Sequence, residues 1–311
     1  MAGVTSSVIS GREPSASQKT LVMTGATTGI GLAAAEQMRQ IPDVRLLLGA
    51  RGQTTASIDS LPLDLARLAS VRSFAAAVEE RLGETSIDAL VLNAGVQFGD
   101  VDHRTEDGFE TTFAVNHLSH YLLLRLLMPR LTPGAVVVIT TSDTHDPKAV
   151  PLAPPEHADA RKLAQGQVRL NSEAKAPGIL AYSTSKLCNL LTARALAMSA
   201  FAQERQLRVI AFNPGLTPGT QLARYAPHVI KLLVNTLVPI LNPILRLNTV
   251  EGGGELLANL ALSEIIPPIG RLYASQVKRR LTWPDPSELA RNDTVTAKLW
   301  QDSADLLGMP E

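Results

Sequence analysis

The stretch TGATTGIG, residues 24–31, lies between an apolar run and a segment with helical spacing. Its glycines, Gly25, Gly29 and Gly31, let the backbone turn tightly and approach a ligand closely. The helix that follows would present unpaired N–H groups and the positive end of its dipole at the turn. The spacing therefore predicts a cradle for a phosphate group, although a turn that only packs a helix on a sheet would use the same residues.

A second candidate for chemistry is the pair Tyr182 and Lys186, four residues apart in a segment with helical spacing. Side chains at this separation share one face of a helix. A tyrosine has a pKa of about 10, and a nearby ammonium group favours its phenolate form. We therefore expect Lys186 to lower the pKa of Tyr182. Without other motifs, a solvated surface contact explains the same pair.

The elements that must position these groups alternate along the chain. Helical spacing predicts helices at 32–40, 68–82, 109–131 and 182–205. Apolar runs predict strands at 19–24, 45–50, 57–63, 89–93, 135–140 and 207–213. This alternation predicts an α/β fold of Rossmann type, in which a doubly wound parallel sheet is covered by helices on both faces in a single domain.

This domain is expected to span residues 19–275, between a flexible N-terminal tail at 1–18 and a C-terminal extension at 276–311. Five prolines mark an inserted loop at 143–178. Within this loop, a short helix is expected around 159–165.

Composition excludes several classes of protein. Of the 311 residues 45% are apolar, and 29 basic residues balance 29 acidic ones, so no charge surplus points to nucleic acid. The one cysteine, Cys188, allows no internal disulfide, which favours a reducing compartment and a cytoplasmic location. The sequence contains no uninterrupted apolar run of about 20 residues, so no transmembrane span is predicted. No metal site is predicted.

Further motifs follow in order: Asp64, LNAG at 92–95, Asn116 in VNHLSH, Ser142, YSTSK at 182–186 and NPG at 213–215. Together with TGATTGIG they resemble the short-chain dehydrogenase/reductase family from residue 19 to about residue 273. The segments EDGFETTFAVNHLSHYLL and YSTSKLCNLL are most similar to the branch of retinol-dehydrogenase-like enzymes and protochlorophyllide reductases.

This resemblance implies a catalytic role for four residues. Tyr182 would be the general acid/base, and Lys186 would assist it. Ser142 would bond the substrate oxygen, which gains negative charge as hydride arrives. Asn116 would kink its helix and hold a water that links Lys186 to solvent. Ser142 is preferred to the threonines before it because His145 stands three positions on, as in the family's serine motif.

The resemblance also implies a nicotinamide dinucleotide, whose expected contacts follow the strand ends. They are Gly25, Thr28, Gly29, Ile30 and Gly31 for pyrophosphate and ribose; Asp64 and Leu65 for adenine; Asn93, Ala94 and Gly95 beside the ribose; Tyr182 and Lys186; Pro214 and Gly215 beside nicotinamide; and Thr220 for the carboxamide. Thr220 is equally explained as a turn-stabilising residue. Arg51 stands where an acidic residue would select NAD(H), and its guanidinium suits a phosphate, so NADP(H) is favoured over NAD(H).

The substrate side is less constrained. Residues 228–247 are strongly apolar and lie in the segment 217–247, where the family places its substrate lid. An apolar lid predicts a bulky apolar carbonyl or alcohol as substrate. A core helix, a subunit contact of a homo-oligomer or a weak peripheral membrane contact would explain the same pattern.

The sequence thus predicts an NADP(H)-dependent oxidoreductase that moves hydride between nicotinamide and a carbonyl or alcohol. Two alternatives remain open. One is a C=C reductase of the protochlorophyllide reductase type, which Leu216 disfavours because those enzymes carry a cysteine there. The other is a non-catalytic NADP-binding sensor, which would have no need of Ser142, Tyr182 and Lys186.

Overall fold

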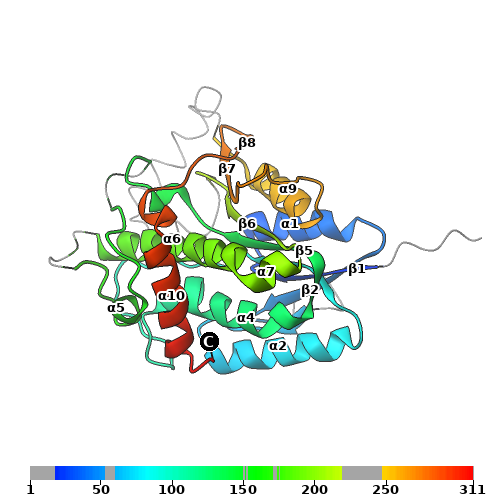
Figure 1. Cartoon of the computed structure of the whole chain (residues 1–311), viewed down its shortest axis with the longest axis horizontal. Helices are drawn as coiled ribbons and strands as arrows, with labels where there is room; N and C mark the ends of the chain where they lie inside the picture. Colours follow the sequence, from blue (N-terminus) through cyan, green and yellow to red (C-terminus); the bar gives the residue numbers. More distant parts are fainter. Residues whose placement is uncertain are drawn as a thin grey trace, which may run out of the picture.

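The computed structural model describes residues 18–52, 60–149, 151, 153–170, 174, 176–218 and 247–310. These residues form an eight-stranded sheet with helices on both faces (Figure 1). The strands are β1 (Lys19–Thr24), β2 (Val44–Ala50), β3 (Ser60–Pro62), β4 (Ile87–Leu92), β5 (Leu131–Thr140), β6 (Arg208–Asn213), β7 (Tyr273–Val277) and β8 (Arg280–Thr282).

The described helices vary from single turns to long rods. The α-helices are α1 (Gly29–Arg39), α2 (Leu68–Leu82), α3 (Thr111–Phe113), α4 (Ser119–Leu127), α5 (Ala160–Ala164), α6 (Pro177–Met198), α7 (Ala200–Glu204), α9 (Val250–Ala261) and α10 (Asp293–Leu306). The shorter turns are η1 (Ala114–Leu118), η2 (Met128–Arg130), η3 (Asp143–His145) and η5 (Leu289–Arg291), of which η1 is π-helical and the others 3-10.

The sheet has the strand order β3-β2-β1-β4-β5-β6-β7-β8, and all neighbours are parallel except β7 and β8. The order reverses at β1 and β4, so the predicted doubly wound α/β fold is confirmed. Val22 faces the core beneath α2, α4 and α6, whereas Leu21 and Met23 face the core beneath α1 and α9 (Figure 1). Both faces of β1 are therefore buried, which explains why its sequence does not alternate with polar residues.

The prediction of one continuous helix at 109–131 is wrong, because this range contains several shorter helical elements. Glu110 accepts hydrogen bonds from the first backbone N–H groups of α3, and the π-helical turn η1 then separates α3 from α4. The α-helix ends at Leu127, since Pro129 allows only the 3-10 turn η2. Strand β5 begins at Leu131, four residues before its predicted start.

The helix predicted at 182–205 is displaced towards the N-terminus. α6 begins at Pro177, whose fixed φ suits the first turn of a helix, and it ends at Met198. The hydroxyl of Ser199 accepts a hydrogen bond from the backbone N–H of Ala202 and so caps the separate helix α7.

The C-terminal residues continue the same fold. β7 crosses residue 275, where the sequence places the end of the domain, and β8 adds an antiparallel edge strand. α10 packs against α6, and its Trp300 meets Tyr121 of α4 edge-on with the ring centroids 4.9 Å apart. None of the helices in the described ranges has both the length and the apolar character needed to cross a membrane.

Close packing between α1 and α9 positions the start of α1. A Cβ atom on Gly254 of α9 would lie 2.5 Å from the Cβ of Ala33 and 2.9 Å from the backbone nitrogen of Ala34. Glycine at this position therefore lets the two helix backbones touch. Because α1 begins in the glycine-rich turn, this contact also holds that turn against the sheet.

We predict that Gly254→Ala lowers the free energy of unfolding by roughly 1–3 kcal/mol, because the added methyl group must push α1 and α9 apart. Thermal unfolding measures this change. Gly99→Ala is the control, since no described atom lies within 4 Å of the Cβ position of Gly99. Equal melting temperatures for the two variants would contradict the packing argument.

Candidate active site

The candidate site lies where four parallel strands end at the same edge of the sheet. Thr24 ends β1, Asn93 follows β4, Ser142 stands two residues after β5, and Asn213 ends β6. The strand order reverses between β1 and β4, and open α/β sheets bind ligands at such a point. The topology therefore brings together residues that are far apart in the sequence.

The glycines of the TGATTGIG turn are required for different reasons. A Cβ atom on Gly25 (φ 71°) would lie 2.6 Å from the Cα of Ala94, and one on Gly31 would lie 1.9 Å from the carbonyl oxygen of Gly25. Gly29 (φ 56°) begins α1, and no described atom beyond its own neighbours lies within 4 Å of its Cβ position. The start of α1 is therefore open on the side of Gly29, beside the exposed Thr28, and a helix N-terminus that is open in this way fits a pyrophosphate.

Thr24 is the centre of a buried hydrogen-bond network. Its hydroxyl lies 2.9 Å from Nε2 of His120, and it accepts hydrogen bonds from the backbone N–H groups of Asn93 (3.0 Å) and Ala94 (3.2 Å). The side chain of Asn93 donates to the carbonyl oxygen of Gly25 and accepts from the hydroxyl of Thr140. These bonds tie the ends of β1, β4 and β5 together and fix the backbone on which a cofactor would rest.

Asn116 lies in the π-helical turn, as expected for a residue that kinks its helix. Its Oδ1 accepts from the backbone N–H of Val96, and its Nδ2 donates to the carbonyl oxygen of Val96 and the hydroxyl of Ser185. Its own carbonyl oxygen lies 3.0 Å from Nδ1 of His120. The amide group of Asn116 therefore joins α6 to the loop that follows β4.

Tyr182 and Lys186 are both buried on α6, with exposed fractions of 8% and 2%. Nζ of Lys186 donates to the carbonyl oxygen of Thr140 (3.2 Å) and lies 5.6 Å from the ring centroid of Tyr182. Burial lowers the pKa of Lys186 from 10.5 to about 8. Asn189 also donates to the carbonyl oxygen of Thr140 (3.0 Å).

The prediction that Lys186 lowers the pKa of Tyr182 is wrong for the protein without bound ligands. Burial raises the pKa of Tyr182 above its usual value, while a hydrogen bond with Ser142 acts in the opposite direction. A phenolate would lose its hydration in this buried site, and the ammonium of Lys186 lies over the ring. Tyr182 therefore holds its proton at neutral pH, with its hydroxyl bonded to Ser142.

The remaining predicted contacts lie around the same edge or outside the described residues. Arg51 is exposed directly after β2, and the side chain of Ile30 lies against Gly253 of α9. A Cβ atom on Gly95 would lie 3.3 Å from Nζ of Lys186, so the backbone of Gly95 lies beside this ammonium group. Thr220 and residues 219–246 of the predicted lid lie outside the described residues.

Asp64 and Leu65, which are expected to contact adenine, both make hydrogen bonds within the protein in the loop after β3. The carboxylate of Asp64 accepts a hydrogen bond from the backbone N–H of Ala66. The carbonyl oxygen of Leu65 accepts one from the hydroxyl of Ser119 on α4. Both residues therefore shape this loop.

Pro214 and Gly215, the residues expected beside nicotinamide, are held in place by Asn248 and β7. The carbonyl oxygen of Pro214 accepts from Nδ2 of Asn248 (2.9 Å), which also donates to the carbonyl oxygen of Gln276. Gly215 (φ 63°) has no room for a side chain, because a Cβ atom would lie 2.3 Å from that same oxygen of Gln276. β7 therefore supports the turn that follows β6.

Sequence reasoning assigned no role to four buried polar residues that organise this site: His120, Asn189, Asn248 and Tyr273. His120 and Asn189 are polar residues in helices whose other residues are largely apolar, and a sequence carries this signal. Asn248 and Tyr273 become part of the site only because the chain returns to the sheet at β7.

Comparison with known proteins assigns the chain to a family. The family described as short chain dehydrogenase matches residues 19–151. Retinol dehydrogenase 12 from Homo sapiens is 32% identical over 308 residues, which cover 94% of this chain and 87% of that protein. Protochlorophyllide reductase A from Hordeum vulgare is 29% identical over 337 residues and covers 99% of this chain and 84% of that protein.

A solved structure of an uncharacterised protein from Mycobacterium paratuberculosis has the same fold. It superposes with a TM-score of 0.65 at 26% identity, covering 94% of each chain. The chain therefore belongs to the short-chain dehydrogenase/reductase family, in the branch of the retinol dehydrogenases and protochlorophyllide reductases. It is an oxidoreductase of the type that acts on CH–OH groups, with a nicotinamide cofactor.

We predict that Lys186→Met raises the free energy of unfolding by roughly 1–3 kcal/mol at pH 7, because it removes a buried ammonium. The carbonyl oxygen of Thr140 keeps its hydrogen bond from Asn189 in this variant. Folding lowers the lysine pKa, so the folded protein gains stability as the pH rises from about 8 towards 10.5. The advantage of the variant should shrink across this range.

Chemical denaturation at several pH values measures this difference. The control is Lys148→Met, at an exposed lysine, which should give no pH-dependent change. A destabilised Lys186→Met protein at pH 7 would contradict the assignment of a desolvation cost to Lys186.

Proposed function

We propose that this protein is an NADP(H)-dependent oxidoreductase that transfers hydride between nicotinamide and a carbonyl or alcohol of a bulky apolar substrate. The observation that carries the proposal is the meeting of Ser142, Tyr182, Lys186 and Asn116 at one buried edge. They come from the segment after β5, from α6 and from η1. A protein that only bound the nucleotide would have no need of this group.

The reaction follows from the protonation states. When bound, the reduced nicotinamide supplies a hydride to the carbonyl carbon. Ser142 donates a hydrogen bond to the substrate oxygen, on which negative charge develops. Tyr182 gives its proton to the same oxygen, which completes the alcohol. A raised tyrosine pKa suits this direction, because the proton is present at neutral pH.

Lys186 and Asn116 act behind the tyrosine. The ammonium of Lys186 lies over the ring of Tyr182 and stabilises the phenolate that remains after proton transfer. Asn116 holds α6 against the loop after β4 through Ser185 and Val96. We assign to Asn116 the positioning of the helix that carries both residues.

An apolar substrate is supported by residues beside the turn that follows β6. Leu216 comes directly after Gly215 and is 69% exposed. The sequence from 228 to 247 adds an apolar segment that the family places over the substrate. A cytoplasmic location and a homo-oligomeric state remain predictions from the sequence.

The function is tested by following NADPH oxidation at 340 nm with a panel of retinoid, steroid, aliphatic and aromatic carbonyls. We expect turnover with at least one bulky apolar carbonyl, in the dark. NADPH binding without turnover across the panel would favour a sensor. Reduction of protochlorophyllide that requires illumination would favour the C=C reductase, in line with the 29% identity to the barley enzyme.

We predict that Tyr182→Phe lowers kcat by at least about a thousandfold, since the proton donor is lost, while the Kd for NADPH changes less than about threefold. Stopped-flow kinetics and fluorescence titration measure the two quantities. Tyr121→Phe removes a different buried hydroxyl, which donates to the carbonyl of Trp300, and should keep kcat. A Tyr182→Phe enzyme with full turnover would remove the acid/base role.

We predict that Arg51→Asp shifts the ratio of kcat/KM for NADPH over NADH by at least about a hundredfold towards NADH. The carboxylate would repel the 2′-phosphate and bond the ribose hydroxyls instead. Lys19→Asp, a charge reversal at the opposite edge of the sheet, is the control. An unchanged cofactor ratio in Arg51→Asp would exclude Arg51 from cofactor selection.

A further inference from the structure

His145 is a buried residue that lies between the candidate catalytic serine and the C-terminal part of the chain. Its exposed fraction is 2%, and its ring packs edge-on against Tyr273 with the centroids 5.2 Å apart. Nδ1 lies 2.6 Å from the carbonyl oxygen of Ser142. Nε2 lies 3.3 Å from the backbone nitrogen of Ser287. The ring therefore bridges two segments that are 142 residues apart in the sequence.

These partners determine the tautomer of His145. The carbonyl oxygen of Ser142 can only accept, so Nδ1 carries the hydrogen and donates it. The N–H group of Ser287 can only donate, so Nε2 presents its lone pair. A neutral ring satisfies both bonds, and burial lowers the pKa of His145, which agrees with this state.

The bond to Ser142 closes the turn on which the serine hydroxyl depends. The hydroxyl of Ser142 accepts a hydrogen bond from the backbone N–H of Thr144, so it caps the 3-10 turn η3. His145 is the last residue of η3, and its ring returns to the carbonyl oxygen of Ser142. Movement of the ring would therefore change the orientation of the hydroxyl that faces Tyr182.

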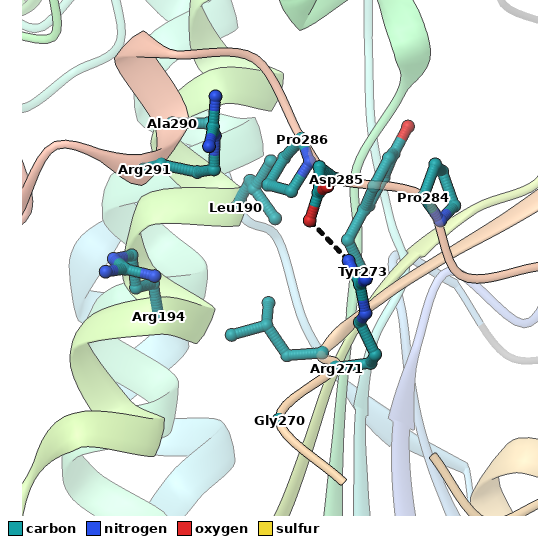
Figure 2. A pocket seen from close by; sticks show the side chains of 11 residues that line it. Leu190, Arg194, Gly270, Arg271, Tyr273, Pro284, Asp285, Pro286, Ala290 and Arg291 are labelled. Atoms are coloured by element: carbon teal, nitrogen blue, oxygen red, sulfur yellow. Dashed lines mark hydrogen bonds and ion pairs between the residues drawn. The ribbon is translucent and has the colours of Figure 1, made fainter. Parts of the chain in front are cut away.

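The C-terminal partner is the segment 284–291, which we call the docking segment. Ser287 and Ala290 are 7% and 1% exposed, and the hydroxyl of Ser287 accepts from the backbone N–H of Ala290. Figure 2 shows the segment crossing above Leu190 of α6 and beside Tyr273 of β7, with the ion pair between Asp285 and Arg271 marked.

A cavity of about 100 Å³ lies between the docking segment, α6 and β7 (Figure 2). Leu190, Tyr273 and Ala290 are among the residues that line it. The bond from Ser287 to His145 links the docking segment to the turn that carries Ser142.

We propose that His145 is a positioning residue that couples docking of the segment 284–291 to the orientation of Ser142. The proposal rests on the proposed function for its effect on turnover. The C-terminal extension thereby acts on the catalytic edge without touching substrate or cofactor.

The contact between His145 and the docking segment can be disrupted from either side. An asparagine at 145 places its amide nitrogen near the position of Nδ1 and keeps a donor for Ser142, but its shorter side chain has no atom at the position of Nε2, so the N–H group of Ser287 loses its acceptor. Ala290→Asp places a carboxylate in the buried contact and undocks the segment from a residue remote from Ser142. Thr294→Asp adds the same charge at an exposed position of α10 and is the matched control.

Hydrogen–deuterium exchange of the full chain tests the coupling without any substrate. We expect His145→Asn to speed exchange of peptides covering 284–291 at least about tenfold. We also expect Ala290→Asp to speed exchange at 141–149, around Ser142, while the β1 and β4 peptides keep their wild-type rates. Unchanged exchange at 141–149 in Ala290→Asp, once 284–291 has opened, would overturn the proposal.

Kinetics provide the second readout. With an active carbonyl, both variants should lower kcat by about 10- to 100-fold and leave the Kd for NADPH within about twofold, because a displaced hydroxyl weakens only the transition state. The double variant should be no slower than the slower single variant, since both remove the same coupling. Additive losses would contradict coupling through His145. If the wild-type protein turns over no carbonyl, the proposed function fails, and the exchange experiment still decides the coupling.

Discussion

Burial of polar groups at the carboxyl edge of the sheet is the constraint on which the rest of this structure depends. Lys186 is 2% exposed, and no carboxylate among the described residues lies within ion-pair distance of it. Its ammonium is held by the carbonyl oxygen of Thr140 and by the ring of Tyr182. Such a group is costly in a folded protein unless its surroundings are fixed in advance. The surrounding network of strand ends supplies that rigidity.

The same network explains how distant segments form one site. Thr24 joins the ends of β1 and β4, and Asn93 joins the glycine-rich turn to Thr140 of β5. Asn116 and His120 tie the π-helical turn to these loops. The side chains of Thr24, Asn93 and Asn116 are all hydrogen-bonded, so this network fixes the backbone around the candidate catalytic side chains.

Comparison with relatives agrees with this view of the site. Retinol dehydrogenases and protochlorophyllide reductases are about equally similar to this chain, yet their printed names describe different reactions. The family therefore establishes the oxidoreductase class and leaves the substrate to be found by experiment. The contact from Ser287 to His145 joins the C-terminal part of the chain to the segment that follows β5.

The α/β fold was predictable because its signals are local. Apolar runs identified β1, β2, β4, β5 and β6, and the motif positions indicated which strand ends meet. The kink expected at Asn116 coincides with η1, whereas the break at Ser199 was missed although its cap is local, since the hydroxyl of Ser199 accepts from the backbone N–H of Ala202.

The sequence by itself determined the alternation of strands and helices, the family, and the identity of Tyr182, Lys186, Ser142 and Asn116 as candidates. Only the tertiary structure decided the pKa shifts of these residues and which other residues hold them in place. Burial reverses the expected direction of the tyrosine pKa, because loss of hydration depends on every atom packed around the hydroxyl. His145, Asn248 and Tyr273 join the site only when β7 and the docking segment return to the sheet, since their partners lie far away in the chain.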